Sequence, residues 1–276
     1  MKPVAFSHTL PDSVAEATRL AAGGVDVKII GGGQSLGPML NLRLARPETL
    51  VDVAALNDLR RIADTGSHVE IGATIRHAEI EDGAVPDPIP GMLRHVAGGI
   101  AYRAVRNKGT IGGSLCHADP AADWVSAMTA LDATLVIAGQ DGSTREVPMT
   151  RFMEGAYRTS LEPGEVLCTI RIPKCGADAR WGYYKICRKV GEFADAIAAT
   201  VIDPERRYCR VVFGAASGAP LVARDLAQSL AETGSTATQG EVKDALLTLD
   251  PALDSIKCHQ LAVAYARCLA EAMPND

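Results

Sequence analysis

Aromatic side chains are scarce in this sequence, since Phe, Trp and Tyr together make up only 4% of its 276 residues. Single-stranded nucleic acids bind on platforms of stacked rings, which so few aromatics do not supply. Positive charge is also in short supply: 28 Lys and Arg stand against 33 Asp and Glu, for a net charge of −5. Because nucleic-acid binding needs clustered cations, we expect no nucleic acid among the partners of this chain.

Long apolar runs are absent as well. No stretch of about 18 apolar residues occurs, so the sequence predicts no membrane-spanning helix. The segment Met1–His8 lacks the apolar core of a secretory signal. With 47% hydrophobic and 22% charged residues, the composition is that of a globular protein of about two domains. We expect a cytoplasmic protein.

The seven cysteines lie far apart along the chain. No pair has the Cys-x-x-Cys spacing of a structural zinc site, and no close run of three or four exists for an iron–sulfur cluster. An odd number without tight spacing is also poorly suited to a disulfide framework. The sequence therefore predicts reduced cysteines and no metal in this chain. If the protein handles electrons, any iron–sulfur centre belongs to a partner.

Helix and strand signals alternate over the first part of the chain. Ser13 and Glu16 form a capping-box pattern at the start of a helix that Gly23 and Gly24 end. Three alternate prolines within 85–91 predict a stiff exposed loop. Other runs predict strands over 25–30, 50–53, 69–73, 133–138 and 166–172, and helices over 92–97 and 120–131.

The pattern changes after Pro173–Gly176, where we place a domain boundary. Strand-like runs over 180–188, 194–201 and 208–215 precede helices over 221–232, 241–249 and 256–272. Strands grouped before helices indicate an α+β unit. In the last helix seven residues share one face at helical spacing and are expected in the core: Cys258, Leu261, Ala262, Tyr265, Cys268, Leu269 and Ala272.

Two glycine-rich segments carry the chemical signal. The first, Gly31–Pro38, follows a strand, but Leu36 occupies the place of the third glycine in a dinucleotide-binding fingerprint. Asp52 then only imitates the ribose-binding acid of that motif, and no Gly-Lys-Ser/Thr follows for a Walker loop. Consecutive glycine N–H groups nevertheless form a concave anion site, to which Gln34 and Ser35 add side-chain donors.

The second segment, Thr110–Ser114, offers the same groups about 80 residues later. Each segment alone is also compatible with a tight turn, but the pair suits a ligand with two linked phosphates. Asp119 and Asp123 follow it and either accept hydrogen bonds from sugar hydroxyls or complement a helix N-terminus. His77 has no nucleophile to serve and is interpreted as structural. We interpret Cys116–Asp119 as a crowded loop rather than a metal site.

These segments resemble the FAD motifs of one family. Gly31–Pro47 is similar to the first motif of the flavoprotein subunits of molybdenum hydroxylases, and Arg106–Ser114 with His117–Asp123 is similar to the second. That family includes the medium subunit of aerobic carbon monoxide dehydrogenase and the FAD domain of xanthine dehydrogenase. The resemblance continues through Pro163–Leu167 and Arg188–Ala194. It covers nearly the whole chain, more loosely toward the end.

The resemblance implies an α+β fold in two domains. Residues 1–175 would form a FAD-binding domain of two α/β subdomains, about 1–55 and 56–175, of the vanillyl-alcohol-oxidase or PCMH-like type. Residues 176–276 would form a C-terminal domain with a three-stranded antiparallel sheet and helices. No catalytic residue and no metal ligand is implied in this chain.

The resemblance also implies where FAD is bound. Backbone amides of both glycine segments would hold the pyrophosphate, Asp123 would bind cofactor hydroxyls, and Leu167 and Lys185 would lie at the flavin end. Phe193 replaces a tyrosine of some members, so any role of that hydroxyl is absent here. The implied cofactor-binding residues are Gly31, Gly32, Gly33, Gln34, Ser35, Leu36, Thr110, Ile111, Gly112, Gly113, Ser114, Asp119, Asp123, Leu167, Lys185 and Phe193.

An electron-transfer subunit is the function that follows from the resemblance. Its partners would be a large subunit with a molybdenum–pterin cofactor and a small subunit with [2Fe-2S] clusters, in a heterotrimer. Two alternatives stay open: a self-sufficient FAD oxidoreductase acting on a nicotinamide or small organic substrate, and a nucleotide-binding assembly subunit without redox use. The hydroxylase substrate (carbon monoxide, a purine or an N-heterocycle), the electron acceptor and a peripheral membrane association of the complex also stay open.

Overall fold

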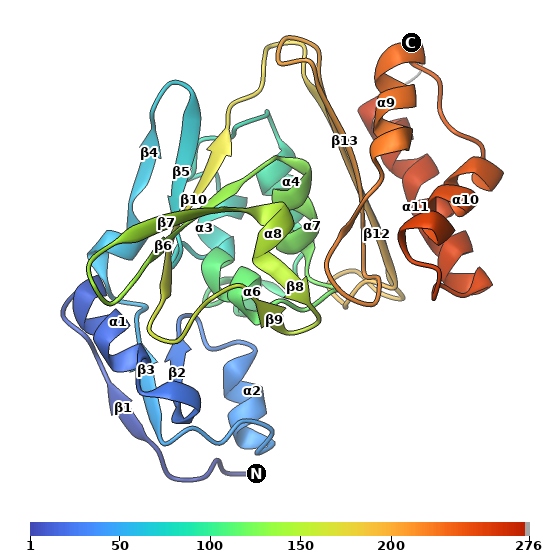
Figure 1. Cartoon of the computed structure of the whole chain (residues 1–276). Coiled ribbons are helices and arrows are strands. Elements are labelled where there is room, and N and C mark those ends of the chain that lie inside the picture. Colours follow the sequence, from blue (N-terminus) through green and yellow to red (C-terminus); the bar gives the residue numbers. More distant parts are fainter. Residues whose placement is uncertain (274–276) are drawn as a thin grey trace.

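The computed structural model describes residues 1–273 (Figure 1). An N-terminal subdomain, a middle subdomain and a C-terminal sheet covered by helices follow one another along the chain. Among the described residues, none of the helices combines the length and hydrophobicity needed to cross a membrane.

The N-terminal subdomain contains a parallel three-stranded sheet of order β1-β3-β2. Ser13 caps its first helix by accepting a hydrogen bond from the Glu16 N–H at 3.1 Å. The Glu16 carboxylate in turn accepts from the Asp12 N–H, so the capping box closes one residue earlier than expected. The elements are β1 (Ser7–Thr9), α1 (Val14–Ala21), the 3₁₀ turn η1 (Gly24–Asp26), β2 (Val27–Ile30), α2 (Leu36–Asn41) and β3 (Thr49–Asp52).

The middle subdomain is built around a five-stranded antiparallel sheet of order β4-β5-β10-β6-β7. Alternating residues of its strands, such as Ile71 and Ile170, are fully buried against the helices. On the other face Arg171 of β10 bridges Glu70 and Glu146. The elements are the 3₁₀ turn η2 (Asn57–Arg60), β4 (Ile62–Asp64), β5 (His68–Gly72), α3 (His77–Glu81), α4 (Met92–Gly98), α5 (Arg103–Arg106), α6 (Ile111–His117), α7 (Asp123–Ala130), β6 (Thr134–Ala138), β7 (Thr144–Pro148), α8 (Met149–Phe152), β8 (Met153–Gly155), β9 (Arg158–Thr159) and β10 (Val166–Pro173).

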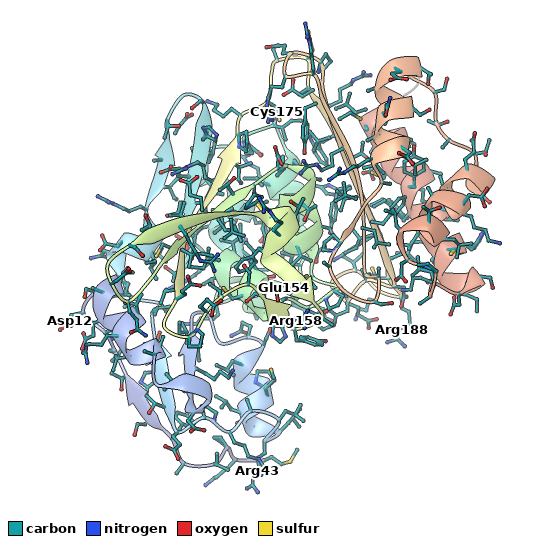
Figure 2. All side chains as sticks on the ribbon, viewed as in Figure 1. Asp12, Arg43, Glu154, Arg158, Cys175 and Arg188 are labelled. Atoms are coloured by element: carbon teal, nitrogen blue, oxygen red, sulfur yellow. The ribbon has the colours of Figure 1, made fainter. Side chains whose placement is uncertain are left out.

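The C-terminal part contains an antiparallel sheet of order β11-β12-β13-β14 with three helices on one face (Figure 1). All seven residues predicted for the core face of the last helix are buried, which confirms that prediction. The passage from the middle subdomain runs past Cys175 (Figure 2). The elements are β11 (Arg180–Ile186), β12 (Ala196–Asp203), β13 (Tyr208–Gly214), β14 (Leu221–Val222), α9 (Arg224–Thr233), α10 (Gln239–Leu249) and α11 (Ser255–Ala272).

One hydrophobic core joins the middle subdomain to the C-terminal sheet. Trp124 of α7 and Ile170 of β10 belong to the same buried cluster as Val201 of β12 and Val212 of β13. The opposite face of β12 and β13 packs against α9–α11 in a second cluster. The C-terminal sheet therefore stands between α7 and α11, as Figure 1 shows. The division of the chain into domains at residue 175 stays a prediction.

Several sequence expectations need correction. The C-terminal sheet has four strands, because Leu221–Val222 pairs with Phe213 and Val212 in a stretch predicted to be helical. The middle subdomain is α+β rather than α/β, since every strand pair of its main sheet is antiparallel. The strand predicted over 25–30 begins only at Val27, after the turn η1.

The loop predicted over 85–91 is not generally exposed. Val85, Pro88 and Ile89 are buried, because this segment packs into the core next to α4. The second glycine segment is also not a loop throughout: Ile111–Ser114 forms the first turn of α6.

Candidate functional site

The two glycine segments, distant in sequence, meet in the structure. A Cβ added to Gly32 would lie 1.9 Å from the Lys108 carbonyl oxygen and 2.7 Å from the Gly109 Cα. One added to Gly31 would lie 3.1 Å from the Thr110 hydroxyl oxygen. Backbones approach this closely only where no side chain intervenes. The contact joins the β2–α2 connection of the N-terminal subdomain to the start of α6 in the middle subdomain.

The first segment presents free backbone donors. Within the part of the chain that the structure describes, the N–H groups of the five consecutive residues Gly32–Leu36 donate to no other group. Gly33 adopts φ = +69°, a conformation that favours glycine. The Gln34 side chain donates back to the Gly32 carbonyl oxygen at 3.1 Å. Successive unpaired N–H groups that lead into a helix attract anions, so this segment fits the diphosphate of a dinucleotide.

The second segment differs because its amides are already used. The N–H groups of Ile111 and Gly112 donate to the Ile75 and Ala73 carbonyl oxygens at 3.0 and 2.9 Å. The Gly113 N–H donates to the Thr110 hydroxyl at 3.1 Å. The Ser114 N–H donates to the Thr110 carbonyl at 3.0 Å. Gly113 is exposed and Ser114 half-buried. Their cofactor-binding role stays a prediction. The structure shows the Ile111 and Gly112 amides holding α6 against the segment that follows β5.

Asp123 and Lys185, predicted separately, contact each other. Lys185 Nζ lies 2.9 and 3.2 Å from the two Asp123 carboxylate oxygens and donates to the Gly99 carbonyl at 2.8 Å. Both side chains are about nine-tenths buried. The Tyr183 hydroxyl, which the sequence reasoning missed, donates to Asp123 Oδ1 at 2.8 Å. Its position two residues before Lys185 on one strand was the available signal, because such residues share a face.

Burial, reinforced by the negative charge of Asp123, raises the pKa of Tyr183 well above its ordinary value. The phenol therefore stays protonated and remains a hydrogen-bond donor at any physiological pH. Asp123 opens α7, where a carboxylate also complements the helix dipole. Both sequence interpretations of Asp123, cofactor contact and helix N-terminal acid, are compatible with this position.

The remaining predicted residues lie around this region in different surroundings. Asp119 accepts hydrogen bonds from the Ala121 N–H at 2.9 Å and from the Tyr157 hydroxyl at 3.4 Å. Leu167 is buried in β10 beside an irregularity in the pairing with β6. Phe193 is 73% exposed in the connection after β11, which begins near Arg188 (Figure 2). The structure therefore brings Gly31–Gly32 to Lys108–Thr110 and Asp123 to Lys185, but leaves Phe193 at the surface.

His77 is structural, as the sequence predicted. Its Nδ1 accepts a hydrogen bond from Trp124 Nε1 at 3.0 Å inside the core. Burial, and secondarily the charge of Arg106, lowers the pKa of His77 to about 4. Gly109 packs against the ring, since a Cβ there would lie 2.9 Å from it. In residues 1–273 no group of three potential ligands gathers to hold a metal.

Known proteins resemble this chain over most of its length. The family described as the FAD binding domain in molybdopterin dehydrogenase matches residues 4–175. The carbon monoxide dehydrogenase medium chain of Hydrogenophaga pseudoflava is 40% identical over 204 residues, which are 73% of this chain and 70% of the relative. The caffeine dehydrogenase subunit beta of Pseudomonas sp. strain CBB1 is 32% identical over 225 residues, 80% of this chain and 76% of the relative.

Solved structures agree. A carbon monoxide dehydrogenase structure from Hydrogenophaga pseudoflava, which lacks the Mo-pyranopterin moiety of the molybdenum cofactor, superposes with a TM-score of 0.89 at 34% identity and covers 99% of this chain and 98% of its own. Quinoline 2-oxidoreductase from Pseudomonas putida 86 gives 0.86 at 32%, with the same coverage. The fold and the glycine site thus define a FAD-binding module of the molybdopterin dehydrogenases, and the chain belongs to that family. It is an oxidoreductase subunit, the FAD-binding subunit of a molybdenum hydroxylase, rather than a self-sufficient enzyme.

Proposed function

We propose that the five free amides of Gly32–Leu36 hold the FAD pyrophosphate, and that Asp123 and Lys185 contact other parts of the cofactor. The single observation that carries this is the run of unpaired N–H groups wedged against Lys108–Thr110. Hydrogen bonds from several amides to a charged diphosphate act together, each contributing about 1.5–3 kcal/mol. The Asp123 carboxylate, held by Lys185 at 2.9 Å, suits an acceptor for cofactor hydroxyls.

The cofactor supplies the redox chemistry when bound, accepting electrons from one partner and releasing them to an external acceptor. The residues of this chain bind and orient it. Gly32 sets the distance between the two subdomains, Gly33 turns the amides toward the anion, and Lys185 holds Asp123 in a largely buried position. We propose that a large subunit with a molybdenum–pterin cofactor and a small subunit with [2Fe-2S] clusters complete the assembly.

The medium-chain and subunit-beta relatives support that assembly. A cytoplasmic location is part of the proposal and is supported by the seven free cysteines. A peripheral membrane association of the complex stays open.

Titration of the full chain with FAD, FMN and ADP tests the cofactor assignment. We expect FAD to bind at least about a hundredfold more tightly than FMN, because FMN lacks the second phosphate, and ADP to compete with FAD. Equal affinities for FMN and FAD would contradict the diphosphate site.

Purification from the native host tests the assembly. Molybdenum and iron should co-purify with the chain, and full activity in the free chain would remove the need for partners.

A further inference from the structure

Strand β11 directs alternate side chains toward the FAD-binding part of the chain. Trp181 Nε1 donates to the Pro90 carbonyl at 2.9 Å, Tyr183 to Asp123, and Lys185 to Gly99 and Asp123. Tyr184, between them, faces the other way and contacts Arg267 of α11. One strand of the C-terminal sheet thus reaches a carboxylate that the preceding 175 residues leave without any other side-chain partner.

The two donors to Asp123 are not equivalent. Lys185 divides its three N–H groups between the carboxylate and the Gly99 carbonyl. The Tyr183 phenol has one proton, gives it to Asp123 Oδ1, and is 3% exposed. Lys185 can turn toward another anion without leaving its place on the strand, whereas Tyr183 has no other acceptor among its contacts in the described residues.

The two oxygens of Asp123 also differ. Oδ1 receives both the phenol and the ammonium, at 2.8 and 2.9 Å. Among the described residues, Oδ2 receives only the longer Lys185 contact of 3.2 Å. A carboxylate oxygen accepts about two hydrogen bonds, so Oδ1 is saturated and Oδ2 keeps acceptor capacity. An oxygen with free capacity in a largely buried carboxylate is suited to a hydroxyl of a bound ligand.

We propose that Tyr183 is a positioning residue for the cofactor: its hydroxyl fixes Oδ1 of Asp123 so that Oδ2 meets a hydroxyl of FAD. This inference rests on the proposed cofactor role of Asp123. Tyr183 itself does not touch the cofactor, and it acts only through the carboxylate. The C-terminal sheet thereby contributes the alignment of a residue that lies in the FAD-binding part of the chain.

The variant Tyr183→Phe in the full chain removes the phenol oxygen and keeps the ring that fills the core. FAD affinity, measured by quenching of flavin fluorescence, should fall about tenfold, the loss expected for one hydrogen bond to a charged group. Tyr184→Phe is the matched control, since its hydroxyl faces α11, and it should keep the affinity within twofold. Unchanged affinity in Tyr183→Phe would overturn the proposal.

A double-mutant cycle with Asp123→Asn tests whether the Tyr183 hydroxyl acts through the carboxylate. In the Asp123→Asn background the added Tyr183→Phe change should alter FAD affinity less than twofold, because no carboxylate remains to be aligned. A tenfold loss in both backgrounds would show that the Tyr183 hydroxyl acts independently of Asp123, and it would overturn the proposal. If Tyr183→Phe alone does not fold, the comparison of Asp123→Asn with the double variant, in which no carboxylate lacks its phenol donor, still decides.

The same cycle distinguishes failure of this inference from failure of the proposed function. If Asp123→Asn binds FAD as tightly as the unaltered chain, Asp123 does not contact the cofactor and the cofactor role proposed for it above is wrong. If Asp123→Asn weakens FAD binding while Tyr183→Phe does not, Asp123 keeps its role and only the positioning role of Tyr183 is lost.

Discussion

Individual glycines in the first segment serve different purposes. Gly32 lacks a side chain because backbone lies where a Cβ would be, Gly33 because of its positive φ, and Gly37 meets nothing within 4 Å. The sequence motif alone does not distinguish these three reasons for a glycine. In the structure only Gly33 is tied to the conformation of the amides, while Gly32 is tied to the contact between subdomains.

Replacing Gly32 by alanine should destabilise the chain by about 2–3 kcal/mol, because the Lys108 carbonyl is backbone and cannot rotate away. We expect the thermal midpoint to fall by roughly 5–10 °C and FAD binding to weaken with it. Scanning calorimetry of the chain measures the shift. Gly37→Ala is the control and should be neutral or slightly stabilising, since it lies in α2 in open space. Equal midpoints for the two variants would disprove the close contact.

His77 makes the stability of the fold depend on pH. Its pKa of about 4 in the folded chain lies below the ordinary 6.5, so the unfolded state binds the proton first as pH falls. Unfolding free energy should therefore decrease between pH 6.5 and about 4, by about 3 kcal/mol in total, and be fully retained above pH 6.5. His77→Asn should remove this decrease of the unfolding free energy, because asparagine does not titrate and its amide oxygen can still accept from Trp124. Denaturant titrations at several pH values measure the unfolding free energy of both proteins. If the unfolding free energy of His77→Asn falls with pH as steeply as that of the unaltered chain, the prediction is refuted.

Among the elements, α6 departs most from its sequence-based description. The Thr-Ile-Gly-Gly-Ser run predicted a phosphate loop, and the structure shows a helix capped by Thr110 at its N-terminus. Gly112 is needed where α6 meets the segment that follows β5, because a Cβ there would lie 2.5 Å from that of Ala73. Glycine pairs signal either free amides or close packing, and sequence alone does not distinguish the two.

Removing the Thr110 cap should cost about 1 kcal/mol. Thr110→Val keeps the shape but leaves the Gly113 N–H without its acceptor, and it also alters the surface that Gly31 approaches. We expect a lower thermal midpoint and weaker FAD binding. Thr110→Ser keeps the oxygen and should behave as the parent. A valine variant with unchanged stability would mean that the cap contributes nothing.

The strands and helices that sequence periodicity located best are the long ones with one buried face, such as α11 and β10. Short elements escaped it: β1, β8, β9 and β14 contain two or three residues each, too few for a period to show. The pairing of Asp123 with Lys185 escaped as well, although both were predicted site residues. Their contact arises because the C-terminal sheet packs against α7, a long-range arrangement that no local pattern encodes.

At the scale of the whole molecule, α7 connects the two halves of the chain. Tyr183 and Lys185 bind its first residue. Tyr208 and Arg210 donate to its last carbonyls, those of Ala130 and Thr129, at 2.6 and 2.9 Å. Helix termini leave such groups without partners unless something else supplies them. The C-terminal sheet therefore satisfies two carbonyls at the C-terminal end of α7 and holds the Asp123 side chain at its N-terminal end.

We expect the full chain to unfold in one transition, and residues 1–175 alone not to fold, because truncation would expose the face of α7 and its C-terminal carbonyls. Arg210→Met should lower the single midpoint by the equivalent of about 1–3 kcal/mol, since it removes the bonds to Thr129 and Asp132. Near-ultraviolet circular dichroism and flavin fluorescence should report the same midpoint. Two separate transitions would show that the halves are independent.

The contact at Gly32 also bears on how this sequence would record a change of function over evolutionary time. A descendant that no longer bound FAD would be free to lose Gly33, whose conformation serves the amides. It would keep Gly32, because a side chain there would push the N-terminal subdomain away from Lys108 and Gly109 of the middle subdomain. A glycine at position 32 in a distant relative would therefore indicate that the contact between the subdomains is kept. It would not indicate whether that relative still binds FAD.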